Sequence, residues 1–298
     1  MLVREAVDTV RSMLTGSSID EISVLGENYF AASDNSISLR YPKRNVAVGT
    51  TLSVGLNTFT VLGVSGDGST LEILPSVDGG PDVNALEGEI VRFRPAFTTW
   101  AIFRELQGEI NSMSSPDAGL YWAWIYPTDG VDRVSGTYPL PNDPLPFRLI
   151  KAEYQIIGTA ASQAFTDCEY QAAYNQVRVF SDPPDASGYT FTLAVPFGQM
   201  TDLTTDLTDI GLGEGQLTDI PILGAASTMA LGWEGRRVSP IAQGDTRRQG
   251  EVPVNSNASL SRAWKARQQE TIMQEQARLA SLYGYRQNVT YGYSMWRR

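Results

Sequence analysis

The sequence contains no histidine and only one cysteine, Cys168. Histidine is the commonest general base, metal ligand and triad partner, so the usual sites built on it are excluded. A single cysteine excludes an intramolecular disulfide and a cysteine-rich zinc site, and we expect Cys168 to be a small buried hydrophobe. The chain also lacks a G-x-S-x-G motif and a G-x-x-x-x-G-K-[ST] phosphate loop. These absences argue against an enzyme.

Long hydrophobic runs are absent too, and none approaches the length that crosses a membrane. No basic-then-apolar signal peptide opens the sequence. We therefore expect no membrane partner and assembly in a reducing cytoplasm. Charged residues are sparse at 19%, whereas glycine and proline are plentiful, which favours strands and turns over helices.

The charge is distributed unevenly. Residues 236–298 carry 11 basic and 4 acidic side chains, whereas residues 1–235 carry 12 basic and 29 acidic ones. Such asymmetry often marks a surface that meets a partner of opposite sign. The alternative is that the basic end solvates a helix and complements the acidic body.

Four segments have the apolar spacing of helices, at residues 2–14, 95–113, 219–235 and 258–284. In the third, Gly224 and Ala225 belong to a run of small residues, which lets a neighbouring helix approach closely. We therefore expect this helix to be central and buried. The fourth is the longest, and its narrow apolar side is predicted to carry Leu260, Trp264, Ile272, Met273, Leu279, Leu282 and Tyr283. We expect Trp264, Gly224 and Ala225 to serve packing in a helical bundle or ring.

Two regions have short β-branched segments separated by glycine-rich turns. Residues 20–94 predict a small antiparallel barrel or sheet, and residues 120–200 predict an antiparallel sheet or sandwich. The helices fall at residues 1–16, 95–115 and 217–283. We therefore predict an α+β chain, in which two β-rich insertion domains grow out of the loops of one helical bundle.

The carboxylates offer no clear active site. Asp202, Asp206, Asp209 and Asp219 supply the oxygen ligands that calcium prefers, but their spacing fits no EF-hand, and Thr-Asp pairs commonly form turns and caps. The glycines of GLGEGQ lack a preceding strand and the dinucleotide-binding spacing. We predict no catalytic residue, metal or cofactor. A carboxylate pair of the glycoside-hydrolase kind stays open, because any fold can bring two together.

The helical end of the chain resembles a known family. The stretches DIPILGAASTMALGWEGRR, GDTRRQGEVP and LSRAWKARQQETIMQEQARLASLYGYR look like the C-terminal half of adaptor proteins of tailed bacteriophages. These are also called head-completion or head-to-tail connector proteins. The stretch YNQVRVF...GYTFTLAVPF resembles the β part that precedes this half, so the likeness covers about residues 145–298.

The resemblance implies a structural virion protein at the head–tail interface, assembled in the host cytoplasm. It would form a dodecameric homo-oligomeric ring that docks on the portal protein and contacts a neighbouring connector or tail protein. DNA would pass through the lumen without specific binding, and the acidic stretch from Asp202 to Asp219 would let it slide. The alternatives are another component of the tail or baseplate, and a carboxylate-based hydrolase.

Residues 284–298 are predicted to form an extended docking tail. They contain aromatic and basic side chains and no carboxylate. Tyrosine and tryptophan anchor many protein interfaces, and arginine pairs with a partner's carboxylates. The predicted portal-docking residues are Tyr285, Arg286, Tyr291, Tyr293, Trp296, Arg297 and Arg298. The same tail could instead pack on its own body or contact DNA.

Overall fold

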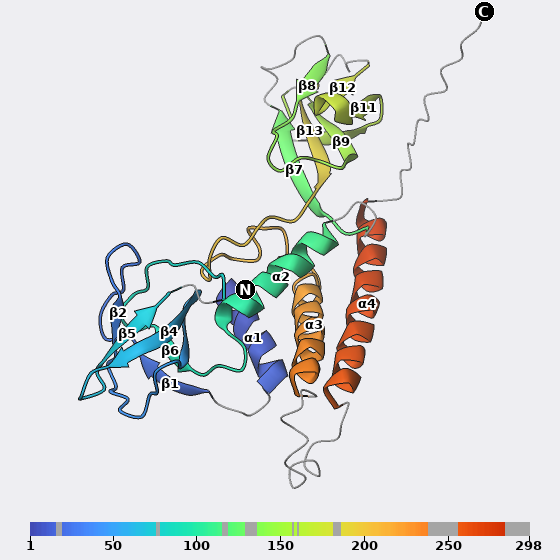
Figure 1. Ribbon diagram of the computed structural model, residues 1–298. Helices are drawn as coiled ribbons and strands as arrows, with labels where there is room; N and C mark the ends of the chain where they lie inside the picture. The colour runs from blue at the N-terminus through green and yellow to red at the C-terminus, as the bar shows by residue number, and fades with distance from the viewer. Residues whose placement is uncertain are drawn as a thin grey trace, which may run out of the picture. The chain divides into compact units, whose positions relative to one another are not determined.

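The computed structural model confirms the mixed α+β fold class, with antiparallel sheets and a long C-terminal helix (Figure 1). The residues that it describes are 1–15, 20–75, 78–114, 119–128, 136–156, 158–159, 161–180, 186–237 and 256–283. The chain divides into two compact units. The first unit comprises residues 1–112 with 198–272, and the second comprises residues 113–197 with 273–298.

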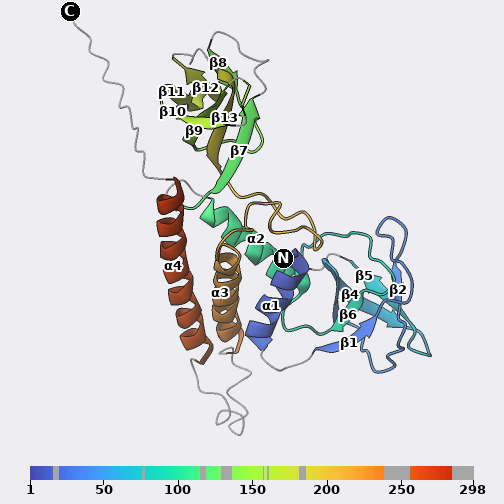
Figure 2. The same cartoon turned by 180° about the vertical axis from the view of Figure 1, so that it is seen from behind.

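Four α-helices occur in the described residues, where the apolar spacing predicted them. They are α1 (Val3–Thr15), α2 (Thr99–Met113), α3 (Asp219–Arg237) and α4 (Ser256–Tyr283). Thr98 caps α2, because its Oγ1 accepts a hydrogen bond from the amide of Ala101 at 3.2 Å. In the first unit α1 packs against α3, and both views place α3 between α1 and α4 (Figures 1 and 2). None of the described helices is long and apolar enough to cross a membrane.

A six-stranded antiparallel sheet belongs to the first unit. Its strands are β1 (Glu21–Val24), β2 (Ser36–Ser38), β3 (Thr51–Val54), β4 (Asn57–Val64), β5 (Thr70–Leu74) and β6 (Ile90–Phe93), in the order β1-β6-β3-β4-β5-β2. The two outermost strands meet at a bridge between Leu25 and Leu39. Backbone hydrogen bonds of 2.8 Å flank this bridge, from Gly26 to Ser38 and from Arg40 to Val24. The sheet therefore closes on itself around a core of buried side chains.

That core is apolar except for one tyrosine hydroxyl. Tyr29 meets Phe59 edge to face, with ring centroids 5.1 Å apart, and its hydroxyl donates to Asp82 at 2.8 Å. Burial is the main cause that raises the pKa of Tyr29. The core residues are Leu25, Tyr29, Ile37, Leu39, Leu52, Val54, Phe59, Val61, Leu71, Ile73, Ala85, Val91 and Phe93.

The turn between β4 and β5 yields a prediction about acid stability. The carboxylate of Asp67 accepts hydrogen bonds from the hydroxyl of Ser65 and from the hydroxyl and amide of Ser69. The Ser65 bond leads these contacts in lowering the pKa of Asp67 to about 2. The carboxyl of an aspartate in an unfolded chain has a pKa of about 3.9. The stabilisation by the ionised Asp67 is therefore present above about pH 4 and is lost as the pH falls towards 2.

We expect Asp67→Asn to lower the urea midpoint of unfolding at pH 6. The difference from the parent chain should shrink as the pH falls from about 4 to about 2, because Asp67 becomes protonated in this range. Urea titrations of both chains across this range measure the difference. A gap that stays constant down to pH 2 would contradict the role given to the ionised carboxylate.

The second unit contains two antiparallel sheets around an aromatic core. The four-stranded sheet has the order β10-β9-β13-β7, with β7 (Trp122–Thr128), β9 (Arg148–Ile156), β10 (Ser162–Phe165) and β13 (Ala186–Val195). The three-stranded sheet has the order β11-β12-β8, with β8 (Thr137–Pro139), β11 (Cys168–Gln171) and β12 (Gln176–Val179). The stretches LYWAWIYP, PFRLIKAEYQIIG, YNQVRVF and GYTFTLAVPF have the pattern of strands and predict β7, β9, β12 and β13. It missed the short strands β8, β10 and β11, which have too few residues for a clear alternation.

Candidate functional site

The predicted packing residues lie where α3 meets its neighbours. Ala225 is fully buried, and Trp264 of α4 is half-buried. Gly224 faces two polar side chains, since a Cβ added there would lie 2.2 Å from Glu109 Oε2 of α2 and 2.3 Å from Gln268 Nε2 of α4. A side chain at this position would force Glu109, Gln268 or both to move away from their present contact. The predicted docking residues of the tail lie outside the described residues.

A polar junction joins α2, α3 and α4 at Gly224. The amide of Gln268 donates to Glu109 Oε2 at 2.8 Å and to the carbonyl of Ile220 at 3.1 Å. Its oxygen accepts from the ammonium of Lys265 at 2.7 Å. Gln268 is 2% exposed and its bond to Ile220 is buried, whereas Lys265 is exposed. The junction therefore fixes the register of three helices that are far apart in the sequence.

A second polar contact links α3 and α4 further along. The hydroxyls of Ser227 and Ser261 lie 3.0 Å apart, and each also lies within hydrogen-bonding distance of the other's backbone carbonyl. Both residues are buried. Small hydroxyl side chains let the two helices approach closely while their polar atoms stay paired. This contact and the Gly224 junction share the same side of α4.

The predicted apolar side of α4 is confirmed only in part, and its members Trp264, Ile272 and Tyr283 are half-buried. Of its members, Leu279 is buried, whereas Leu260, Met273 and Leu282 are 47%, 62% and 58% exposed. The other buried residues of the described helix are polar, namely Ser261, Gln268, Thr271 and Glu275. Ser261, Gln268 and Glu275 recur at a spacing of seven residues, which places them on one side of the helix. A prediction based on apolar residues alone does not detect this pattern. Ser261 and Gln268 hydrogen-bond to other helices, so polar contacts contribute to the packed face together with Leu279.

Sequence reasoning also missed a buried charge cluster in the first unit. Arg11 of α1 is 7% exposed, pairs with Asp8 and donates to the hydroxyl of Thr99 at 2.8 Å. That hydroxyl also lies 3.1 Å from Ser53 Oγ of β3. Burial is the main cause that lowers the pKa of Arg11. The available signal was the position of Arg11, four residues after Val7 on the apolar side of α1.

The charge cluster extends to the strands. Arg92 of β6 lies 3.6 Å from Asp8 and 3.7 Å from Asp20. Two arginines and two aspartates therefore form a balanced network that ties α1 to the closed sheet and, through Thr99, to the start of α2. Each of the four charged groups has an ion-pair partner within the network, so its role is to hold these elements together.

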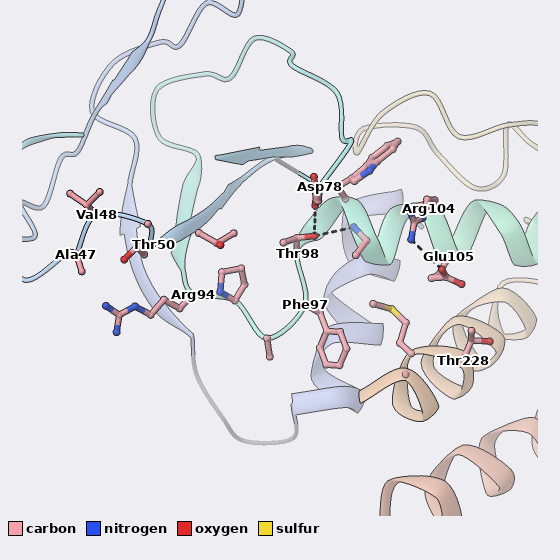
Figure 3. A pocket seen from close by; sticks show the side chains of 18 residues that line it. Ala47, Val48, Thr50, Asp78, Arg94, Phe97, Thr98, Arg104, Glu105 and Thr228 are labelled. Atoms are coloured by element: carbon pink, nitrogen blue, oxygen red, sulfur yellow. Dashed lines mark hydrogen bonds and ion pairs between the residues drawn. The ribbon is translucent and has the colours of Figure 1, made fainter. Parts of the chain in front are cut away.

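A cavity in the first unit has a volume of about 900 Å³ (Figure 3). Its wall combines residues 47–51, residues 94–98, the start of α2 and the exposed side of α3. Phe97, Trp100 and Met229 supply apolar surface, and Arg94 and Arg104 supply charge. Concave surfaces of this mixed kind suit binding of a side chain or a short peptide segment.

The two carboxylates of this cavity already have partners. Asp78 accepts hydrogen bonds from the hydroxyls of Thr58 and Thr98 at 2.9 and 3.1 Å, and from the amide of Gly80 at 3.2 Å. Glu105 forms an ion pair with Arg104 at 3.8 Å. Hydrolysis by two carboxylates needs one protonated acid and one base or nucleophile facing the same bond. The arrangement therefore favours binding over carboxylate chemistry.

Of the four aspartates considered as calcium ligands, Asp202 and Asp206 stabilise turns. Asp202 Oδ1 accepts from the amides of Thr204 and Thr205 at 2.7 and 2.9 Å, and Asp206 Oδ1 accepts from the amide of Thr208 at 2.9 Å. Hydrogen bonding lowers the pKa of both carboxyls, with the Thr204 hydroxyl the largest cause for Asp202 and the Thr208 amide for Asp206. No group of three metal-ligating side chains occurs among the described residues.

Cys168 is only partly buried, so the prediction of a buried small hydrophobe holds in part. It begins β11 and packs against the aromatic core of the second unit. A thiol in this position contributes apolar contact to the core.

No protein-family model matches the chain, and neither a curated protein nor a solved structure matches it.

Proposed function

We propose that the chain is a structural protein of a tailed-phage particle, a head-to-tail connector that docks on the portal. In this proposal the helices at residues 1–16, 95–115 and 217–283 form one bundle. The β-rich domains at residues 20–94 and 120–200 are insertions into its loops. The chain has no catalytic role, metal or cofactor.

The junction at Gly224 is the observation that carries the proposal. Glu109 and Gln268 are 159 residues apart in the sequence, yet they hydrogen-bond beside Gly224 of α3, where an added Cβ would displace them. This contact, together with the packing of α1 against α3, supports the proposed bundle. A helical body with β-rich excursions is the arrangement that the resemblance to connector proteins implies.

The charges of two segments support the partners that we propose. The carboxylates of Asp202, Asp209 and Glu214 are exposed, while the leucines between them are buried and anchor the segment. A surface of this sign repels phosphate, which suits a conduit through which DNA passes without being held. The tail at residues 284–298 has the opposite sign, and we propose it as the element that binds the portal protein.

Repetition would strengthen a modest contact. In a homo-oligomeric ring each copy presents the same tail to the same portal site, so single weak contacts combine into tight attachment. We propose such a ring, expected to be dodecameric, with its other face towards a neighbouring connector or tail protein. It would lie at the head–tail interface of the virion.

Electron microscopy of the chain mixed with the portal protein of the same genome tests the proposed ring. The expected result is an added ring of density with the rotational symmetry of the portal. The portal alone and the chain alone are the controls. Unchanged portal particles, or binding only to isolated tails, would favour the alternative that the chain is a tail or baseplate component.

A further inference from the structure

The strand β7 forms an edge of the four-stranded sheet in the second unit. Among the described residues it pairs with β13 and with no other strand. Its sequence, WAWIYPT, contains no charge, and Ile125 is 63% exposed. The rings of Trp124 and Tyr126 lie 5.5 Å apart. An uncharged aromatic edge strand recruits further strands, so proteins cover such edges.

The other edge of the same sheet differs. It is β10, a strand of four residues whose Ser162 and Gln163 are exposed and polar. Short polar edges of this kind need no cover. The residue Pro127 lacks an amide hydrogen and is tolerated at an edge, so it limits further pairing along β7 to the stretch from Trp122 to Tyr126.

The end of α4 brings the chain to the beginning of this edge. Tyr283 is the last residue of α4, and its ring centroid lies 6.4 Å from that of Tyr121, the residue before β7. The guanidinium of Arg148 lies 5.1 Å from the Tyr121 ring. All three residues belong to the second unit. Residue 284 therefore follows directly from a position beside the start of β7.

The residues that follow have the composition of a strand. Residues 289–296, VTYGYSMW, carry no charge and alternate so that Val289, Tyr291, Tyr293 and Met295 share one face. The five residues of β7 from Trp122 to Tyr126 span about 17 Å, whereas the fifteen residues 284–298 can reach about 50 Å when extended. The segment is therefore long enough to pair along this stretch. Charge also matches, because residues 284–298 have three arginines and no carboxylate, whereas residues 113–197 have 4 basic and 9 acidic side chains.

We propose that residues 289–296 of the same chain add to β7 as a further strand in the free protein. The short tether beside Tyr121 gives the segment a high effective concentration at its own edge strand, which favours it over the tail of a second copy. The inference concerns the chain without its partner and does not need the connector function. If the tail also docks on a portal, docking withdraws it from β7.

Hydrogen–deuterium exchange of peptides that cover Trp122–Thr128 tests the proposal, with three full-length chains and no portal. The parent chain should show slow exchange. Tyr291→Pro removes an amide inside the proposed strand and should speed exchange at Ala123 and Ile125 by about tenfold or more. Gln287→Pro, placed before the strand, is the matched control and should exchange like the parent.

Equal exchange in all three chains would overturn the proposal. Protection in the parent that disappears on dilution would also overturn it, since it would assign the edge to the tail of a second copy. No portal is present in this experiment, so its result is independent of portal binding. The tail can fail to cover β7 while the connector function holds, and it can cover β7 while the connector function fails.

Discussion

Replacing Gly224 by alanine is expected to lower the free energy of unfolding by about 3 kcal/mol. The new methyl group would occupy space within 2.4 Å of Glu109 and Gln268 atoms. Gln268 is buried and holds two hydrogen bonds there, so moving it leaves polar atoms unpaired away from water. These costs outweigh the gain of about 1 kcal/mol that alanine brings to a helix interior.

The matched control for this change lies in the same helix. Gly232 is exposed, and a Cβ added there meets nothing within 4 Å. Gly232→Ala should therefore leave stability unchanged or raise it by up to about 1 kcal/mol. Urea unfolding of the two variants and the parent gives both values. Equal effects at both positions would show that Gly224 is not a packing requirement.

Removing the carboxylate of Asp8 is the second large expected effect, with a loss of about 2 kcal/mol in Asp8→Ala. Arg11 stays buried after this change and loses its nearest counter-charge, whereas Asp8 itself is 53% exposed, which moderates the cost. Nε of Arg11 already has no hydrogen-bond partner in the described part of the chain. The guanidinium would then depend on Thr99 alone among its direct partners.

The double variant separates the charge from other causes. Arg11→Met replaces a buried charge by an apolar chain of similar length, so adding it to Asp8→Ala should recover most of the lost stability. Chemical unfolding of the parent chain, the two single variants and the double variant gives the four free energies of unfolding of a double-mutant cycle. Losses that simply add in the double variant would contradict a coupling between Asp8 and the buried Arg11.

The helices were predictable from sequence, but the packed face of α4 was not. The positions of α1, α2, α3 and α4 follow from apolar spacing and caps, which are local properties. The contacts of Gln268 and Ser261 depend on partners in α2 and α3, far away in the sequence. A polar residue with a buried partner looks, in the sequence alone, like an exposed one.

Long-range strand pairing was likewise beyond local patterns. Glycine-rich turns and β-branched runs indicated antiparallel strands in both β-rich regions. The closure of the first sheet depends on Leu25 meeting Leu39, and the central position of β13 depends on pairing with both β7 and β9. Such pairings are selected by the packing of whole faces, which a single stretch does not reveal.

Co-sedimentation with the portal protein of the same genome tests the connector proposal most directly. The full chain is compared with a chain that ends after Tyr283, and a circular dichroism spectrum of each confirms that both are folded. The account predicts that the full chain sediments with the portal and the shortened chain stays in solution. If neither folded chain binds, the connector assignment is contradicted, and a tail component becomes the better account.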